Sequence, residues 1–183
     1  MIRGMKPAVL VIDVINDFVS GVMGSERSSR VIDPIGRLLE HARSSGIPII
    51  YASDSHTPDD REFDLWPDHA MEGSWGAQVV DEIKPRPGDH IVNKHCYSAF
   101  HDTELDDLLK SLEVDTVIIT GIVTNVCVQH AAADAYFHGY DIVVPEDCVQ
   151  ARSDGEQEAG LQYMRRNYRA EITTSEALMK KHP

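Results

Sequence analysis

Short apolar runs recur along the chain, and most of them contain the β-branched residues that favour strands. Longer segments separate them, so each run is predicted to be a strand that connects to the next one through a helix or a loop. The runs span residues 8–12, 47–52, 91–92, 116–120 and 141–144, with a weaker one at 170–173.

The segments between these runs repeat apolar residues every three or four positions, as Ile35, Leu38 and Ala42 do. Helices are predicted over residues 31–42, 74–83, 105–112, 125–138, 155–166 and 175–181. Strands that alternate with helices form right-handed crossover units and a mainly parallel sheet. The pattern therefore predicts the α/β class, as a three-layer α/β/α sandwich with helices on both faces of the sheet.

The composition is that of an acidic protein with few cysteines. Its 183 residues have the length of a single domain, which we take to span residues 1–183. The net charge of -13 argues against nucleic acid or an anionic membrane as partner, because both attract basic surfaces. The three cysteines are too scattered for a disulfide framework, and the N-terminal residues lack the apolar stretch of a signal peptide. The expected location is therefore cytoplasmic.

Charged and reactive side chains follow the predicted strands directly. They are Asp13 after the first strand, Asp54 and His56 after the second, Lys94 after the third and Cys127 after the fourth. The carboxyl ends of parallel strands lie at one edge of a sheet, where loops converge on a ligand. An acid, a base, a cation and a thiol are thus predicted to share one site.

Cys127 is predicted to be the nucleophile of a cysteine hydrolase. Thr124 and Asn125 offer N-cap side chains for an alanine-rich helix, which puts the cysteine in the first helical turn. Free N–H groups and the positive end of the helix dipole favour the thiolate there. Asp13 would accept the thiol proton and return it to an amine leaving group. A buried Lys94 would stabilise the thiolate and keep Asp13 charged.

The segment after the second predicted strand carries a candidate metal site. Asp54 and His56 lie two positions apart, so both side chains point to the same side of an extended chain. With His69 as a third ligand they would suit zinc or another divalent transition metal. Residues 54–73 form a long irregular connection, and such loops in compact domains are usually functional.

With these residues assembled, the chain resembles the isochorismatase-like cysteine hydrolases, a superfamily that contains nicotinamidases and N-carbamoylsarcosine amidohydrolases. The resemblance covers nearly the whole chain and rests on AVLVIDVINDF, YASDSH, NKHCYSAF and ITGIVTNVCVQHAAADAYFHGYDIVVPEDC. It implies a Rossmann-like fold and assembly as a homodimer or homotetramer. It also implies that Asp13, Lys94 and Cys127 are the catalytic triad, and that the metal ligands are the three residues named above.

Further expectations concern the surroundings of the nucleophile. The resemblance implies a cis peptide between Val123 and Thr124, and an oxyanion hole formed by the N–H groups of Val123 and Cys127. The substrate pocket is expected to be lined by Phe18, Trp66, Tyr97 and Thr124.

The substrate is expected to be a small amide or ureido compound that releases ammonia through a thioester acyl-enzyme. A nicotinamidase-type amidase is the first hypothesis, and an N-carbamoyl amino acid amidohydrolase, such as one acting on N-carbamoylsarcosine, is the alternative. Residues 58–63 depart from the histidine and aromatic residue that nicotinamidases commonly carry there, whereas the intact metal trio favours a nicotinamidase.

Two hypotheses of other classes stand beside the hydrolase. A receiver-like binding module also has an Asp after its first strand and a Lys after a later one, but it needs a cluster of carboxylates for Mg²⁺. A redox thiol protein would need a resolving cysteine, and none lies near Cys127 in the sequence.

Overall fold

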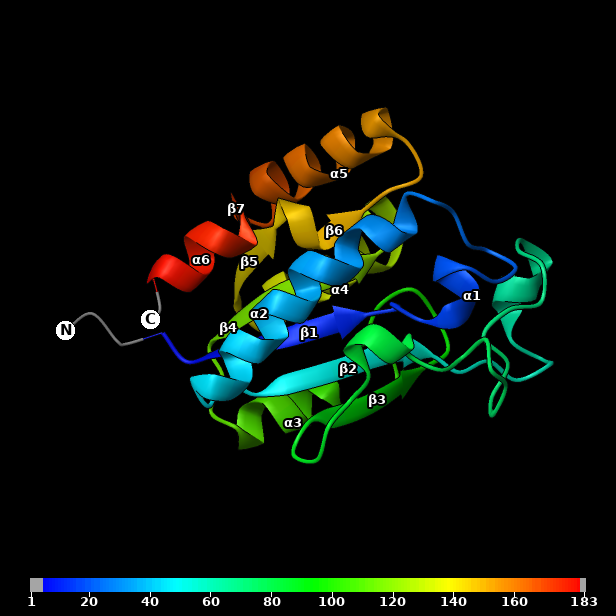
Figure 1. Ribbon diagram of the computed structural model, residues 1–183, viewed down its shortest axis with the longest axis horizontal. Coiled ribbons are helices and arrows are strands. Elements are labelled where there is room, and N and C mark those ends of the chain that lie inside the picture. The colour runs from blue at the N-terminus through cyan, green and yellow to red at the C-terminus, as the bar shows by residue number, and fades with distance from the viewer. Residues whose placement is uncertain (1–4, 182–183) are drawn as a thin grey trace.

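The computed structural model describes residues 5–181, so the first four and last two residues of the predicted domain lie outside it. The described strands form one parallel sheet in the order β3–β2–β1–β4–β5–β7, and the short β6 pairs with the end of β4 (Figure 1). Their bounds are β1 Pro7–Ile12, β2 Ile49–Asp54, β3 His90–Lys94, β4 Thr116–Ile122, β5 Asp141–Pro145, β6 Val149–Gln150 and β7 Glu171–Thr173.

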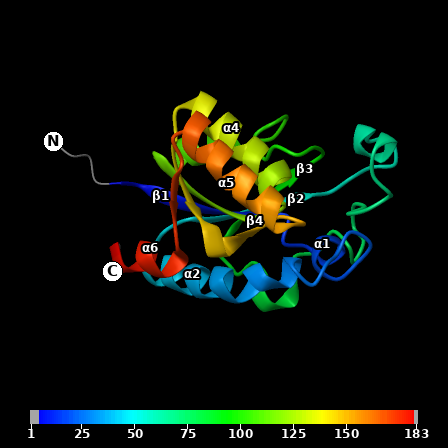
Figure 2. The same cartoon turned by 90° about the horizontal axis from the view of Figure 1, so that it is seen from above.

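Helices cover both faces of the sheet. They are α1 Asn16–Val19, α2 Ile32–Ser44, α3 Leu105–Ser111, α4 Gln129–His138, α5 Asp154–Asn167 and α6 Ser175–Lys181. Figure 2 shows α4 and α5 on one side of the sheet and α2 and α6 on the other. The predicted three-layer α/β/α sandwich is confirmed. Within residues 5–181, no helix combines the length and the apolar character that crossing a membrane requires.

The central strand β1 shows why the sheet is buried on both faces. Leu10 and Ile12 pack into the cluster that includes residues of α3, α4 and α5, whereas Val9 and Val11 pack into the cluster that includes α2 and α6. Successive strand residues point to opposite faces, so a strand covered on both sides must be apolar at every position. The continuous apolar run that predicted this strand is the result.

The predicted helix at residues 74–83 is wrong. Its backbone bonds to the segment that follows β1: the N–H groups of Asn16 and Asp17 donate to the carbonyl oxygens of Gln78 and Gly76 at 2.9 and 3.0 Å. Gly76 approaches Asp17 so closely that a Cβ there would lie 2.0 Å from the carboxylate. Only residues 81–83 form a helical turn, of the 3₁₀ type. The other predicted helices and strands are confirmed, with ends that shift by a few residues.

The strand order reverses between β1 and β4, where loops that follow parallel strands diverge and leave room for a ligand. Gly121 of β4 has φ of 122°, and a Cβ at this position would lie 1.9 Å from the carbonyl oxygen of Ile12. Glycine is therefore required for β4 to approach β1 this closely. Asp13 follows β1 at this point, with φ of 54° in the left-handed region that Asp tolerates better than most residues.

Candidate active site

Lys94 lies at the centre of the site, at the end of β3 and fully buried. Its ammonium contacts three acceptors: Asp13 Oδ2 at 2.7 Å, Asp54 Oδ1 at 2.5 Å and the carbonyl oxygen of Cys96 at 3.1 Å. The ammonium donates hydrogen bonds to Asp54 and to the carbonyl oxygen of Cys96, and its contact with Asp13 is an ion pair. The register of β2 and β3 makes this possible, because Asp54 and Lys94 pair directly at the ends of these strands.

Asp13 connects the strand ends to the thiol. Its Oδ1 accepts a hydrogen bond from the N–H of Asp54 at 2.8 Å, and its Oδ2 forms the ion pair with Lys94. Side-chain atoms of Asp13, Asp54 and Cys127 lie within 4.8 Å of one another, and all three residues are buried. The structure thus brings together the three residues of the predicted triad, with Asp54 as a fourth member.

The helix that carries Cys127 begins differently from the prediction. Residues 124–128 form a π-helical turn before α4, and the N-cap is Val123, whose carbonyl oxygen accepts from the N–H groups of Val126 and Val128. The Thr124 hydroxyl does not cap the helix, because it donates to Gln157 Oε1 at 2.7 Å. The cis peptide joins Ile122 and Val123, one bond earlier than expected.

The electrostatics of the thiol also differ from the prediction. Burial raises the pKa of Cys127 well above its usual value; Lys94 lowers this pKa, but Asp13 and Asp54 add to the rise. The expected resting thiolate is therefore wrong, because burial and the two carboxylates outweigh the effect of the ammonium on the pKa of the thiol. The resting cysteine carries its proton.

Burial and the charge of Asp54 raise the pKa of Asp13 to about 6, although Lys94 acts in the opposite direction. The pKa of Lys94 lies well above its usual value, because Asp13 and Asp54 outweigh the effect of burial. At neutral pH the site thus holds an ammonium, an ionised Asp13 and a neutral thiol. Asp13 is available to accept the thiol proton once a substrate reaches the sulfur.

A small cavity of about 20 Å³ opens onto Cys127. The wall includes Phe18, Trp66 and Tyr97, three of the four expected pocket residues; Thr124 is fully buried and bonded to α5 instead. The Trp66 indole N–H donates to the Tyr97 hydroxyl at 2.9 Å, which fixes this part of the wall.

Arg152 is a lining residue that the sequence analysis missed. Its guanidinium lies 4.8 Å from the centroid of the Trp66 ring, in a cation–π arrangement at the same cavity. Among the described lining residues it is the one guanidinium, and it shares the cavity with Asp54, Glu62 and His69. A single exposed arginine after β6 gives no signal in the sequence, because its place depends on the fold of residues 54–73 against the end of the sheet.

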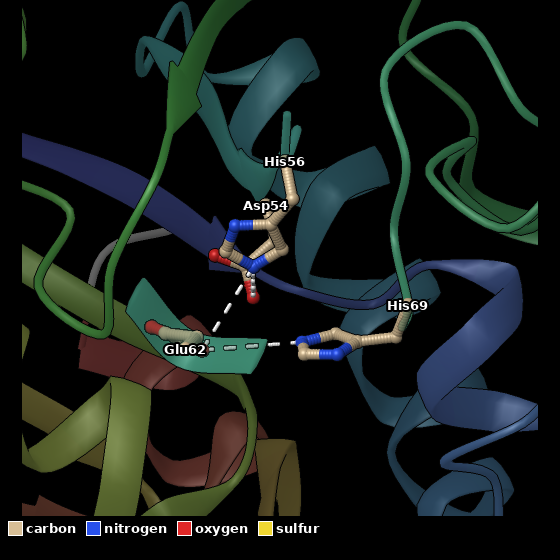
Figure 3. Close-up of side chains that lie close together, drawn as sticks. All are labelled: Asp54, His56, Glu62 and His69. Carbon is tan, nitrogen blue, oxygen red and sulfur yellow. Dashed lines mark ion pairs between the residues drawn. The ribbon is translucent and has the colours of Figure 1, made fainter. Parts of the chain in front are cut away.

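The predicted metal ligands also come together, with an added fourth side chain (Figure 3). Asp54, His56 and His69 converge with Glu62, and one ligand atom of each lies within 4.8 Å of the others. His56 Nε2 lies 3.6 Å from Asp54 Oδ2 and 3.8 Å from Glu62 Oε2, and His69 Nε2 lies 3.9 Å from the same Glu62 oxygen. Ligands at roughly 2.0–2.2 Å around a tetrahedral ion would lie roughly 3.3–3.6 Å apart, so the spacing is close to that of a zinc site.

The residues of this quartet fit a divalent metal in their hydrogen bonding too. The outer Nδ1 atoms of His56 and His69 bond Asp60 Oδ2 at 2.9 Å and the Pro67 carbonyl oxygen at 2.7 Å, which turns both Nε2 atoms inward. Three buried atoms of the quartet find no hydrogen-bond partner among the described residues: Asp54 Oδ2, His56 Nε2 and Glu62 Oε1. Burial and the charge of Asp54 raise the pKa of Glu62 to about 7, a cost that a cation would remove.

Glu62 lies in the 3₁₀ turn Arg61–Asp64, six positions after His56. It belongs to the stretch 58–63 that departs from the nicotinamidase pattern. The sequence showed this departure, but it did not show that Glu62 lies beside the predicted metal ligands. Four acidic residues lie in 59–64, and only the fold of the loop shows which of them points inward.

A buried thiol beside an acid and an ammonium, at the switch point of a parallel sheet, is the arrangement that nucleophilic hydrolysis requires. Residues 7–177 match the family model of the isochorismatase domain, so the chain belongs to the isochorismatase family. The resemblance seen in the sequence is thereby confirmed, and it favours the hydrolase over the receiver and redox hypotheses.

Three relatives illustrate the range of this family. The N-carbamoylsarcosine amidase of Thermoplasma acidophilum is 40% identical, with a TM-score of 0.89 over 93% of this chain and 97% of that one. The ureidoacrylate amidohydrolase RutB of Caulobacter segnis is 32% identical over 84% of this chain and 77% of its own length. The nicotinamidase PncA of Bacillus subtilis is 28% identical, with a TM-score of 0.88 over 92% of this chain and 99% of that one.

Proposed function

We propose that this isochorismatase-family amidohydrolase cleaves a C–N bond of a small ureido acid and releases ammonia through an acyl-enzyme on Cys127. The observation that carries the proposal is the guanidinium of Arg152, which lines the same cavity as the thiol. A substrate that carries both a carbamoyl group and a carboxylate meets both features, because a guanidinium pairs strongly with a carboxylate.

The first half of the reaction forms the acyl-enzyme. Asp13 accepts the proton of the Cys127 thiol while the sulfur attacks the carbonyl carbon, so that an S–C bond forms and the oxygen takes the negative charge. The C–N bond then breaks, and Asp13 returns the proton to the departing ammonia. Lys94 stays charged throughout and stabilises Asp13 and the sulfur while the proton moves.

The negative oxygen of the tetrahedral intermediate needs donors that already point at it. The N–H groups of Val123 and Cys127 are the proposed donors. Val123 lines the cavity beside the thiol, and its carbonyl oxygen is held by two N–H groups of the π-helical turn, which supports a fixed orientation for this peptide.

The second half of the reaction hydrolyses the acyl-enzyme. Asp13 takes a proton from water, the water oxygen attacks the acyl carbon, the C–S bond breaks and the thiol regains its proton. With a ureido acid the product is a carbamate, which loses carbon dioxide to give an amino acid. Asp54, His56, Glu62 and His69 would hold a divalent metal, which supplies Lewis-acid chemistry beside the thiol.

The relatives support this substrate class. N-carbamoylsarcosine and ureidoacrylate, the compounds named for two of them, are both ureido compounds with a carboxylate. A nicotinamidase-type activity is the second candidate, favoured by the metal quartet and by the similarity to the Bacillus subtilis nicotinamidase. A pyridine ring is larger than the cavity of about 20 Å³ at the thiol, so it would have to extend beyond this cavity.

Ammonia release separates the two candidates. The enzyme is assayed with N-carbamoylsarcosine, N-carbamoylglycine, nicotinamide and pyrazinamide, each with and without a chelator. Hydrolysis of the ureido acids is expected to dominate, and metal removal is expected to lower it. Preferential hydrolysis of nicotinamide would overturn the ureido proposal and leave the thiol mechanism in place.

A variant of the arginine tests the carboxylate contact. Arg152→Ala should raise KM for ureido acids by roughly 10- to 100-fold, the value of one charged hydrogen-bonded pair, and should leave KM for an uncharged amide unchanged. Arg165→Ala, an exposed arginine of α5, is the matched control. An equal effect of both variants would contradict the assignment.

A further inference from the structure

A second cavity, of about 310 Å³, adjoins the one at the thiol. The two cavities share four lining residues, namely Phe18, Met23, Val123 and Arg152. The two cavities therefore meet at these four residues, and three of the four are apolar. A volume near 300 Å³ lies within the range of small-molecule sites.

The lining of this second cavity, the side cavity, combines apolar side chains with neutral polar groups and one cation. Val22, Ile122 and Ala151 supply apolar surface, and the serines and Gln150 supply neutral polar groups. Among the described residues that line it, Arg152 carries the charge and no carboxylate is present. The cavity therefore suits an apolar group attached to a carboxylate.

The size of the cavity at Cys127 also indicates that a substrate extends into the side cavity. About 20 Å³ holds little more than one water molecule, which is enough for the reacting end of a carbamoyl group but not for the rest of a substrate. The remainder must extend past the residues that border both cavities. Arg152 is one of them, so the carboxylate-bearing carbon of a ureido acid would lie at this border.

We propose that the side cavity binds the apolar side chain of an N-carbamoyl-α-amino acid, with the carboxylate on Arg152 and the carbamoyl group at Cys127. This inference rests on the proposed function and extends it from ureido acids in general to those with a bulky substituent. The side chain stays attached to the acyl group when ammonia leaves, so the side cavity holds it during both halves of the reaction.

The test compares kcat/KM for N-carbamoyl-leucine with kcat/KM for N-carbamoylglycine. Filling an apolar pocket with a few methylene groups is expected to make this ratio at least about 10 in the unmodified enzyme. Val22→Trp should lower the ratio by at least about 10-fold, because the indole occupies the cavity; Val22 is 58% exposed, so the larger side chain does not enter the core.

Two further variants complete the design. Ile91→Trp, at an apolar position of β3 that is 61% exposed, is the matched control and should leave the ratio unchanged. Met23→Ala removes part of the wall between the cavities and should raise the ratio, so the inference is tested in the opposite direction even if Val22→Trp folds poorly.

The outcomes distinguish a failure of the side cavity assignment from a failure of the proposed function. If the enzyme hydrolyses no ureido acid, the proposed function and the side cavity assignment both fail. If N-carbamoylglycine is hydrolysed as well as N-carbamoyl-leucine, and neither Val22→Trp nor Met23→Ala changes the ratio, the side cavity assignment fails while the proposed function stands.

Discussion

The single ammonium of Lys94 contacts both parts of the site, the proposed catalytic triad and the proposed metal quartet. It contacts Asp13, the proposed base for the thiol, and Asp54, a member of the proposed metal quartet, and both contacts are buried. Removing one member of a buried ionic cluster leaves the others unpaired, which costs about 3–5 kcal/mol. A change of charge at Asp54 would therefore alter the pKa of Asp13, and metal binding and proton transfer would be coupled.

The sequence predicted the members of this cluster but not the charge on its thiol. A helix terminus and a lysine near a cysteine favour the thiolate, and both are visible as a pattern. Full burial of the sulfur beside Asp13 and Asp54 is visible only in three dimensions, and it raises the pKa of the thiol instead of lowering it.

The pH dependence of kcat/KM follows from these pKa values. Asp13 must be ionised to accept the thiol proton, so activity should rise with pH through about 6, the raised pKa of Asp13, and be lost below it. The pKa of Cys127 is raised above its usual value, so no second rise is expected near neutral pH. The measurement is ammonia release as a function of pH.

The control is Asp13→Asn, which should lower kcat/KM by about 10²- to 10⁴-fold and remove the acid limb. A limb at about 4, the ordinary value for a carboxyl group, would contradict the raised pKa.

At the scale of elements, two connections shape the site: the π-helical turn before α4, and residues 55–73 after β2. The strands themselves were predictable, because β1 and β4 are buried on both faces and their apolar runs are continuous. The segment 74–83 was not, because Ala77 and Val79 pack against Ile15 and Phe18 rather than along a helix. Hydrogen bonds to a segment that is distant in the sequence do not change the spacing of apolar residues from which helices are predicted.

The close approach of β4 to β1 makes Gly121 a sensitive position. In Gly121→Ala the new methyl would meet the carbonyl oxygen of Ile12 at 1.9 Å, so the free energy of unfolding should fall by at least about 2 kcal/mol. Urea unfolding followed by circular dichroism measures the change. Gly46→Ala, also at positive φ but with open space around the added methyl, is the control and should cost less.

Asp60 bonds Nδ1 of the proposed metal ligand His56 from outside the quartet. Its carboxylate also accepts from the N–H and hydroxyl of Thr57, which fixes its orientation. Asp60→Asn should therefore weaken zinc binding by about 10- to 100-fold, as measured by competition with a chelating dye. Asp59→Asn, at the neighbouring acidic residue, is the matched control. Equal zinc affinity in the two variants would show that Asp60 does not orient His56.

At the scale of the whole molecule, all candidate chemistry lies at the carboxyl ends of the strands, which leaves the helices and the opposite edge free for other contacts. Figure 1 shows residues 55–73 beyond these strand ends, away from α6 and the start of β1. The net charge of -13 disfavours polyanionic partners. The parallel sheet and the gathering of Asp13, Lys94 and Cys127 at one edge were predictable from the sequence, because the carboxyl ends of parallel strands lie together.

The chain is predicted to assemble as a homodimer or homotetramer. Phe137 is 74% exposed and Leu65 is 76% exposed, so the isolated chain presents apolar surface that association could cover. Sedimentation equilibrium should therefore give a mass of two or four times 20.4 kDa. A mass of one chain at every concentration would contradict this prediction.

The central claim is that the sulfur of Cys127 attacks the substrate. The most direct test is the rate of ammonia release by Cys127→Ala with the best ureido or amide substrate. The account predicts a loss of at least about 1,000-fold, since the step has no other nucleophile, whereas Cys148→Ala should retain activity. A folded Cys127→Ala enzyme that still releases ammonia at a rate near that of the unmodified protein would contradict the account.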